Sequence, residues 1–485
     1  MTYLVAAAFH RRMLQLSISI GSSMIRSLVF VYLPLARIHP PSHWRHPALN
    51  SEFLSWSPSL MSLGSLSHYQ TNCTFDPLPT WLLKANVEAL APSVTHLINL
   101  SLEYAIVPTV LKPAYVTPLL KKAGLDSSDV KSLRSISNLS VVSNYLSALL
   151  QGSSPSIFAR VTCSRNLQSA YRANHSTETA VLKVLADILM ALDSGDFALL
   201  TLLDLSAAFD SVDHGTLVRH LRCSYGLNDA VLDWFSSYLQ GRGQHIRIRT
   251  SSSTPSPVLC HVPQGLVLGP ILFLLYTADL LQLIKRFQLI PHDYADDTQI
   301  FGSCKPSSGE VAALVANVSD CTAKVSSWMR SNRLQLNAAK TEVLWFTSPR
   351  RQHLVSACPV NVCDALVLPV RSVRDFGVHL DSDVSMRVHI NLQVRSCFSA
   401  LRQIRSVRRS IPTTALLTLI RALVISKVDY CISVLVGTSG HLLDRLQLVL
   451  NAAARLVFES RRSDNINYSS PSWTTLADNS WKNTV

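Results

Sequence analysis

The feature that most constrains this chain is an acidic turn, Tyr294-Ala295-Asp296-Asp297, between two short apolar stretches that predict the arms of a hairpin. Adjacent carboxylates in a tight turn repel one another, and a bound divalent cation removes that repulsion. A third acid, Asp204, ends the strand-like run Phe197 to Asp204, which is apolar on both faces, as a covered central strand is. These acids predict a cradle for two Mg²⁺ ions about 3.5–4 Å apart, the arrangement used for nucleotidyl transfer.

Composition supports a polyanionic partner. The 485 residues carry 44 Lys+Arg against 31 Asp+Glu, a formal charge of +13 that suits nucleic acid or an anionic surface. A hydrophobic content of 48% allows a sizeable core, and the length allows two to four domains. Ten cysteines without a CxxC pair predict free thiols rather than a disulfide framework or a zinc site. The apolar run Ser27 to Ala36 is too short to span a bilayer, so no membrane partner is expected.

Two further segments carry candidate nucleotide contacts. Small residues separate Asp204 from Phe209, whose ring would lie under the sugar of an incoming nucleotide and exclude a 2′-hydroxyl, while the main-chain carbonyl of Leu205 is a candidate metal ligand. In Pro263 to Pro270, Gly265 lets the backbone approach a ligand and Gln264 can hydrogen-bond a base or sugar edge. The alternatives are an aspartate that caps the next helix, a core phenylalanine and a plain turn before a helix.

Periodicity and capping residues predict the order of elements around these segments. The predicted helices begin at Pro79 or Thr80, at Ser176 or Thr177 as cap, at Val212, at Asp229, after Pro270 and at Pro412, with helical texture to Phe458. The predicted strands are Leu111 to Lys122, Phe197 to Asp204, His245 to Thr250, Val343 to Phe346 and stretches between Leu366 and Leu380.

Four motifs occur in a fixed order: LLDLSAAFDSVDH, VPQGLVLGP, HDYADDTQI and RLQLNAAKTEVLW. Together they resemble the palm motifs of reverse transcriptases of non-LTR (LINE-type) retrotransposons, and the similarity runs from about Phe75 to Phe458. The resemblance implies an α+β right-hand polymerase with fingers, palm and thumb, whose antiparallel palm sheet is flanked by helices. It implies catalytic, metal-binding roles for Asp204, Asp296 and Asp297.

The same resemblance implies roles for residues around the acids. Phe209 matches the sugar-selecting aromatic, Gln264 and Gly265 the turn over the nucleotide, and Lys340 a lysine near the leaving pyrophosphate that acts as general acid. In the fingers-like region, cations would hold template and triphosphate; they are Lys121, Lys122, Arg134 and Arg172.

Downstream, the resemblance implies a primer hairpin and a thumb. DFGVHLD, Asp375 to Asp381, is similar to the hairpin that holds the primer end. Arg402, Arg405 and Arg409 are expected on one face of one helix, suited to duplex phosphates or, alternatively, an ordinary solvated face.

Departures from the family pattern lie mostly upstream of the palm. SLRSISNLS stands where NYRPISNLS is usual, and Asn144, Ser147 and Ala148 replace a Lys and a Glu-Arg pair. In the palm, His261 and Leu266 replace a usual Gly and Ser, and the imidazole is expected to crowd the nucleotide turn. The usual N-terminal endonuclease is absent and the end diverges after about Glu459, which suggests a fragment or decayed copy.

The implied organisation follows the chain. It has a poorly ordered segment 1–70, fingers 71–196, palm 197–350, primer-grip strands 351–390, a helical thumb 391–460 and a loose tail 461–485, with the reverse transcriptase domain at about 110–380. The favoured function is RNA-templated DNA synthesis, with an RNA template, a DNA primer and dNTPs as partners and no protein partner indicated. The alternatives are a non-catalytic nucleic-acid-binding relic, an RNA-dependent RNA polymerase, which Phe209 disfavours, and a group II intron-type enzyme.

Overall fold

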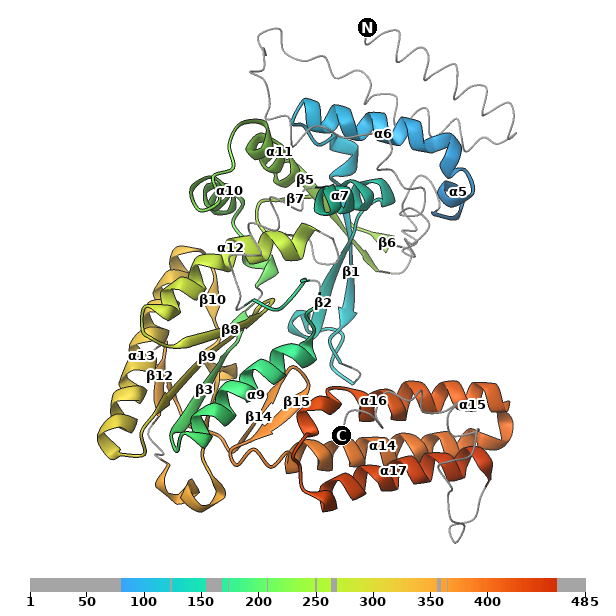
Figure 1. Cartoon of the computed structure of the whole chain (residues 1–485). Helices are drawn as coiled ribbons and strands as arrows, with labels where there is room; N and C mark the ends of the chain where they lie inside the picture. Colours follow the sequence, from blue (N-terminus) through green and yellow to red (C-terminus); the bar gives the residue numbers. More distant parts are fainter. Residues whose placement is uncertain are drawn as a thin grey trace, which may run out of the picture. The chain divides into compact units, whose positions relative to one another are not determined.

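The computed structural model describes residues 80–122, 124–153, 168–172, 174–206, 208–248, 251–262, 268–355, 359–363 and 365–459. The chain divides into two compact units (Figure 1). Unit 1 comprises residues 1–165, 207–279 and 331–334, and unit 2 comprises 166–206, 280–330 and 335–485. Because the units interleave along the chain, the linear fingers, palm and thumb boundaries stay predictions. The predicted segments 1–70 and 461–485 lie outside the described residues.

Unit 2 is built on a four-stranded sheet in the order β11-β3-β9-β8, with every neighbouring pair antiparallel. Its strands are β3 Phe197–Leu203, β8 Ile290–Tyr294, β9 Asp297–Cys304 and β11 Glu342–Phe346. The predicted central strand is confirmed, since β3 lies inside the sheet and six of its seven residues are buried. A strand that is apolar on both faces gains most from an interior position, where helices or loops cover both sides.

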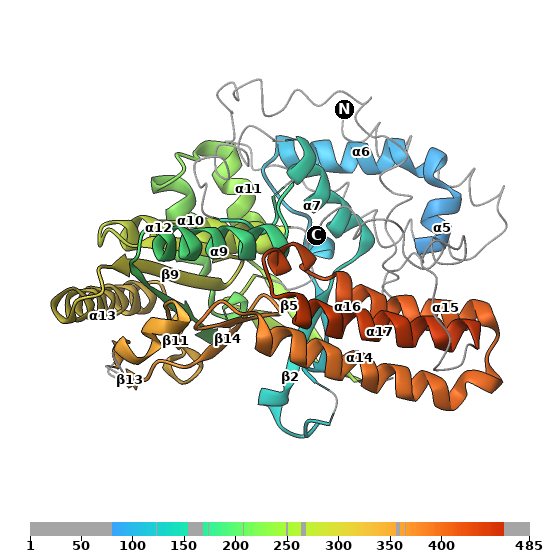
Figure 2. The same ribbon diagram turned by 60° about the horizontal axis from the view of Figure 1, so that its bottom comes forward.

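Helix α9, Thr177–Asp193, lies along one face of this sheet (Figure 2). The predicted cap is Ser176, whose hydroxyl accepts from Thr179 N at 3.2 Å while Thr179 Oγ1 accepts from Ser176 N at 2.8 Å. This reciprocal capping satisfies two amide groups that the first turn leaves unpaired. The helix buries its apolar stripe in the same core as β3 and β11. The longer helix α13 spans Ser308–Ser331.

The C-terminal part of unit 2 is helical, and its helices run side by side in both views (Figures 1 and 2). They are α14 Arg387–Val407, α15 Thr413–Ile420, α16 Ser426–Asp429 and α17 Gly440–Phe458. Small two-stranded sheets precede them: β10 Gln335–Leu336 with β4 Leu205–Ser206, β12 Val360–Val362 with β13 Ala365–Val367, and β14 Ser372–Asp375 with β15 Val378–Asp381.

Unit 1 has its own sheet, β2-β1-β5-β6, with β7 also paired to β5; β1 and β5 are parallel and the other pairs are antiparallel. Its strands are β1 Ala114–Leu120, β2 Leu133–Asn138, β5 Arg242–Ile248, β6 Ser251–Ser252 and β7 Ser256–Val258. The helices are α5 Thr80–Ala85, α6 Val87–Glu103, α7 Val141–Ser153, α10 His214–Cys223, α11 Asp229–Leu239 and the first part of α12 Leu268–Lys285. The α+β class is therefore confirmed.

Helix α12 is long and apolar enough by composition to cross a membrane. However, 72% of its residues are buried inside the protein, the pattern of a core helix. An all-round apolar helix is expected where neighbouring elements cover every face.

The β14–β15 hairpin closes through a two-residue turn, Phe376-Gly377, with φ values of 45° and 89°. Positive φ at both central residues is the mark of a type I′ turn, which suits the twist of the flanking strands. The Tyr430 hydroxyl donates to Phe376 O at 2.5 Å, and its ring leaves little room above the turn. A Cβ on Gly377 would lie 3.1 Å from Tyr430 Cε1.

Gly377→Ala should therefore lower the stability of the chain through backbone strain and through a clash with Tyr430. We expect a loss of about 1 kcal/mol from strain and about 1–3 kcal/mol more from overpacking, measured as a fall in thermal midpoint. Gly124→Ala is the matched control, because Gly124 has φ +87° but a Cβ added to it would meet no atom within 4 Å. Equal losses for the two variants would contradict the role of the Tyr430 contact.

Candidate active site

The structure brings the three predicted acids together at one end of the unit 2 sheet. Leu203 in β3 pairs with Thr298 in β9, Asp204 directly follows Leu203, and Asp297 directly precedes Thr298. The two aspartates therefore leave adjacent strands at the same end, where opposite residues are about 5 Å apart. Asp296 belongs to the two-residue turn between β8 and β9, beside Asp297.

The turn itself is tight. Tyr294 pairs with Asp297, so Ala295 and Asp296 alone reverse the chain. Ala295 has φ +60°, in the left-handed region that favours glycine. A non-glycine residue held there indicates strain that the surrounding structure must offset.

The carboxylates interact electrostatically. Loss of hydration, followed by the negative charges of Asp296 and Asp204, raises the pKa of Asp297 to about 6. The residue as a whole remains exposed, so solvent and a hydrated cation can reach the carboxyl group. Two like charges that raise a neighbour's pKa mark a place where a cation is stabilised.

A fourth acid, Asp375, lies behind the turn. It is 2% exposed and accepts from Gln299 Nε2 at 2.5 Å. Burial raises the pKa of Asp375 to about 7; the charge of Asp297 acts in the same direction, and the Gln299 hydrogen bond opposes it. Asp375 ends β14, the first strand of the predicted primer hairpin, so this hairpin adjoins the acid-bearing strand β9.

Lys340 also lies at the acids. Its Nζ is 3.3 Å from Asp204 Oδ2. Backbone contacts hold its loop there: Leu336 in β10 pairs with Leu205 in β4, and Asn337 N donates to Asp204 O at 2.9 Å. The Lys340 side chain is 67% exposed, and an ion pair so exposed is worth about 0–1 kcal/mol, so another cation can readily replace the ammonium group.

The residue types fit a hard divalent cation, whose preferred ligands are carboxylate oxygens. Asp204 Oδ2 is buried and accepts no hydrogen bond from the described part of the chain. Within that same part, no group of three or more His, Cys, Asp or Glu side chains is already gathered closely enough to hold a metal ion. The metal roles of Asp204, Leu205, Asp296 and Asp297 remain predictions.

The predicted nucleotide residues belong to unit 1. The Phe209 ring packs against Phe273 with centroids 4.6 Å apart, and Phe209 O accepts from Val262 N at 3.1 Å. This bond joins Phe209 to Val262, the residue directly before the P-Q-G segment, Pro263 to Pro270. Gln264 and Gly265 themselves lie outside the described residues. The contact with Phe273 packs one face of the Phe209 ring, and its sugar-selecting role remains a prediction.

His261, just before this segment, occupies a position suited to glycine. Its φ is +86°, and its buried Nε2 has no hydrogen-bond partner among the residues described. Burial, and then the charges of His214 and Arg242, lower the pKa of His261 to about 4. The backbone thus keeps the conformation for which the family uses glycine, while the side chain adds a poorly accommodated imidazole.

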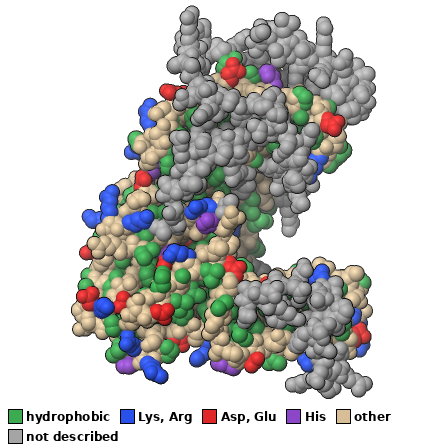
Figure 3. Space-filling model, viewed as in Figure 1, with side chains coloured by type: hydrophobic (Ala, Val, Ile, Leu, Met, Phe, Trp, Pro, Cys, Tyr) green, Lys and Arg blue, Asp and Glu red, His purple; other side chains and the backbone are tan. Residues whose placement is uncertain are grey.

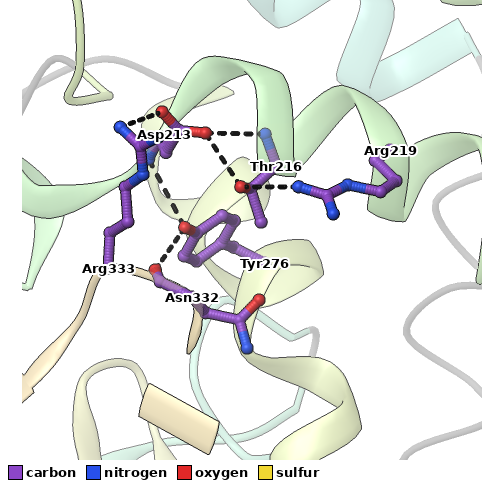
Figure 4. A network of polar contacts seen from close by, with 6 residues as sticks. All are labelled: Asp213, Thr216, Arg219, Tyr276, Asn332 and Arg333. Carbon is purple, nitrogen blue, oxygen red and sulfur yellow. Dashed lines mark hydrogen bonds and ion pairs between the residues drawn. The ribbon is translucent and has the colours of Figure 1, made fainter. Parts of the chain in front are cut away.

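Asp213, in the same LLDLSAAFDSVDH motif as Asp204, has different surroundings from Asp204. Asp213 caps α10, accepting from Thr216 N at 2.9 Å, and pairs with Arg333 Nη1 at 3.1 Å (Figure 4). In the same network the Tyr276 hydroxyl donates to Asn332 O at 2.5 Å. Asp213 is therefore a structural acid that joins α10 to the 331–334 segment, and it is not a candidate ligand.

Three of the four predicted cations of the fingers-like region lie on the β1–β2 hairpin of unit 1, whereas Arg172 belongs to unit 2. Lys121 and Lys122 directly follow β1, Arg134 pairs with Leu119 across the hairpin, and all three cations are exposed. Burial raises the pKa of Asp210, and the charge of Lys121 acts in the opposite direction, so Lys121 lies near the Phe209 segment.

One of the predicted phosphate-binding arginines, Arg409, differs from expectation. Arg402 and Arg405 are exposed one turn apart on α14, but the helix ends at Val407 and Arg409 lies in the following 3₁₀ turn, Arg408–Ser410. The prediction that all three share one helix is wrong, because the 3.6-residue pattern does not reveal the helix end. Arg172 Nη1 donates to Gln168 O at 3.0 Å. On the face in Figure 3, basic side chains are interspersed with acidic ones rather than gathered in one patch.

Gln168 is a site residue that the sequence analysis missed. Its Oε1 accepts from Ala295 N, in the acidic turn, at 3.2 Å. The two residues are 127 positions apart, and only the glutamine's place directly upstream of Arg172 could have drawn attention to it.

His261→Gly should stabilise the chain by about 1 kcal/mol, since glycine adopts φ +86° without strain and no imidazole is buried. The folded-state pKa of His261, about 4, lies below its ordinary value of 6.5. As the pH falls, His261 is protonated in the unfolded chain before it is protonated in the folded chain. The stabilisation by His261→Gly should therefore grow as the pH falls from 6.5 toward 4. Thermal midpoints measure the effect. His245→Gly, in strand β5, is the control and should lower the midpoint.

Asp297→Asn should raise stability at pH 8, by about 1 kcal/mol because solvent screens an exposed carboxylate. The folded-state pKa, about 6, is above the ordinary 3.8 because of burial first and then the charges of Asp296 and Asp204, so the cost of the Asp297 charge is present above pH 6 and disappears as the pH falls below about 4. Denaturation at pH 8 and pH 4 compares the two conditions. A gain of equal size at both would show that the Asp297 charge carries no cost in the folded chain.

Comparison with known proteins agrees with this geometry. Residues 120–379 match the family model described as Reverse transcriptase (RNA-dependent DNA polymerase). The probable RNA-directed DNA polymerase from transposon X-element of Drosophila melanogaster is 26% identical over 351 residues, covering 70% of this chain and 37% of that protein. The RNA-directed DNA polymerase from mobile element jockey of the same organism is 23% identical over 302 residues, covering 61% and 32%.

The chain thus spans about a third of the length of the curated relatives it matches. Telomerase from Candida albicans, solved with a TWJ fragment of telomeric RNA, is 11% identical and covers 81% of this chain and 68% of that one at a TM-score of 0.40, too low to support an argument. The family match covers more than half of the 485 residues and agrees with the LINE-type resemblance of the motifs. The chain belongs to the reverse transcriptase (RNA-dependent DNA polymerase) family.

Proposed function

We propose that the chain is an RNA-directed DNA polymerase that extends a DNA 3′-hydroxyl with dNTPs on an RNA template. The observation that carries the proposal is the convergence of Asp204, Asp296 and Asp297 at one end of the unit 2 sheet, where they raise the pKa of Asp297. Family membership supports the same chemistry.

In this proposal Asp204, Asp296 and Asp297 hold two Mg²⁺ ions, with the Leu205 carbonyl as a further ligand. When bound, these cations would lower the pKa of the primer 3′-hydroxyl and offset the negative charge of the triphosphate. The protein contributes alignment, because sheet register fixes where the carboxylates leave the backbone.

Lys340 is the proposed general acid. It lies beside Asp204 through the β4–β10 pairing, and an ammonium group there can hold a proton near the leaving pyrophosphate. With Asp204 engaged by a cation, Lys340 would no longer be held in this ion pair, and its ammonium group could donate a proton to the leaving pyrophosphate.

Unit 1 supplies the proposed nucleotide contacts, and both units carry cations that are proposed to contact the nucleic-acid backbones. Phe209 would exclude a ribose 2′-hydroxyl, since its ring is held by Phe273. Gln264 and Gly265 would line the nucleotide, and Arg134 would contact its phosphates. Lys121, Lys122, Arg172, Arg402, Arg405 and Arg409 are proposed to contact the template and primer backbones.

The second candidate is a nucleic-acid-binding relic that no longer catalyses. One observation favours it: His261 adopts φ +86° with an unpartnered buried nitrogen directly before the P-Q-G segment. Primer extension on poly(rA)·oligo(dT) with Mg²⁺ separates the candidates. Incorporation of dTMP excludes the relic, and tight binding without incorporation supports it.

Asp296→Asn should abolish primer extension, by about a thousandfold or more, while template–primer affinity stays within about twofold. Loss of one carboxylate weakens cation binding where charge develops, whereas duplex binding rests on Lys and Arg. Gel-based extension and fluorescence anisotropy measure the two properties.

Asp193→Asn is the control for this experiment. Asp193 is an exposed acid at the end of α9 and lies four residues before β3 begins, whereas Asp204 follows the other end of β3. Its replacement should therefore leave extension unchanged. Normal extension by Asp296→Asn would end the metal assignment.

A further inference from the structure

The acidic turn adopts a conformation that its own sequence does not favour. Ala295 has φ +60°, and neither Ala295 nor Asp296 is glycine. In a two-residue hairpin turn with positive φ at the first central position, glycine is the preferred residue there. A residue outside the hairpin must therefore stabilise the turn. Within the described part of the chain, a side chain distant in sequence accepts a hydrogen bond from the turn's backbone.

That side chain is Gln168, which is 5% exposed. Its Oε1 accepts two backbone hydrogen bonds, from Ala295 N at 3.2 Å and from Ala170 N at 2.9 Å. Because both partners are N–H donors, the amide atom that faces them must be the oxygen and not the nitrogen. These two donors fix the orientation of the Gln168 amide group. Its oxygen thus joins the backbone at Ala170 to the acidic turn at Ala295.

The backbone of Gln168 is also fixed against the hairpin. Gln168 forms a parallel bridge with Asp293, and Ser169 N donates to Asp293 O at 2.9 Å. Asp293 immediately precedes Tyr294 at the end of β8. The glutamine is thus attached to the strand that enters the turn and, through its side chain, to the first residue of the turn.

We propose that Gln168 is a positioning residue of this polymerase, and that its side-chain oxygen holds Ala295 in the left-handed conformation that sets the directions of Asp296 and Asp297. The inference rests on the proposed function. Gln168 touches none of the proposed reacting groups and acts through the turn. An unpaired Ala295 amide and a strained φ would otherwise favour a relaxed turn, with the two carboxylates turned away from Asp204.

Gln168→Met keeps the size of the side chain and removes the accepting oxygen. We expect kcat for primer extension to fall about tenfold to a hundredfold, because displacement of catalytic groups by about 1 Å has effects of this size. The KM for dTTP and the template–primer Kd should stay within about twofold, since the substrate contacts lie elsewhere. A purely structural role would instead lower the amount of active enzyme and leave kcat per active site unchanged.

The decisive measurement is rescue by Ala295→Gly. Glycine adopts positive φ without strain, so the turn no longer needs the Gln168 oxygen. Measured against the Ala295→Gly chain, the Gln168→Met/Ala295→Gly chain should lose little kcat, so that the effect of Gln168→Met largely disappears when residue 295 is glycine. A double variant as slow as Gln168→Met would overturn the proposal.

A second readout does not depend on catalysis. The Ala295 amide should exchange with solvent about tenfold faster in Gln168→Met, as expected for loss of one hydrogen bond, while amides in the middle of β3 and β9 keep their rates. Unchanged exchange at Ala295 would overturn the proposal even if kcat falls.

The kcat and amide-exchange measurements together distinguish failure of the proposed function from failure of the Gln168 proposal. If the parent chain does not extend a primer, the proposed function fails, and the Ala295 exchange rate still decides whether Gln168 holds the turn. If Gln168→Met does not fold, Gln168→Asn replaces it, since its shorter side chain cannot reach Ala295 but remains polar. The same faster exchange at Ala295 is then expected, and parent-like exchange contradicts the proposal.

Discussion

The structure of unit 2 depends on holding three carboxylates together against their own repulsion. Asp204 and Asp297 leave adjacent strands because Leu203 pairs with Thr298, and Asp296 is their neighbour in the turn. Burial raises the pKa of Asp297 to about 6, and the charges of Asp296 and Asp204 act in the same direction. A loop could relieve this repulsion by moving, but β3 is buried on both faces and paired on both sides. The apolar core therefore maintains an arrangement of like charges that is unfavourable on its own.

Lys340 moderates this cost while no metal is bound. Its ammonium nitrogen lies 3.3 Å from Asp204 Oδ2 and provides one positive charge beside three carboxylates. Because the pair is exposed and weak, a divalent cation competes with it easily. If the acids hold a cation as proposed, Lys340 would be left as an unpaired ammonium group beside them, in place to act as the proposed general acid.

Much of this arrangement could be predicted from local sequence patterns. The apolar run before Asp204, the hairpin around Asp296 and the Ser176 cap depend on residues close in the chain, and the structure contains all three. Arg409 was assigned to the wrong element because helical periodicity continues past Val407, where the helix ends. Gln168 could not be found this way, since its partner Ala295 is 127 residues away and the hydrogen bond follows from tertiary packing.

The departures from the family pattern and the intact acids fall in different units. His261 and the altered β1–β2 and α7 segments belong to unit 1, whereas Asp204, Asp296, Asp297, Lys340 and Gln168 belong to unit 2. Each unit has its own sheet, so strain at His261 need not disturb the register of β3 and β9. Under the proposed function, cation binding by unit 2 and nucleotide binding by unit 1 would therefore fail separately. A chain that binds metal normally but uses dNTPs poorly would place its defect in unit 1, and relief of the His261 strain would be the first change to make.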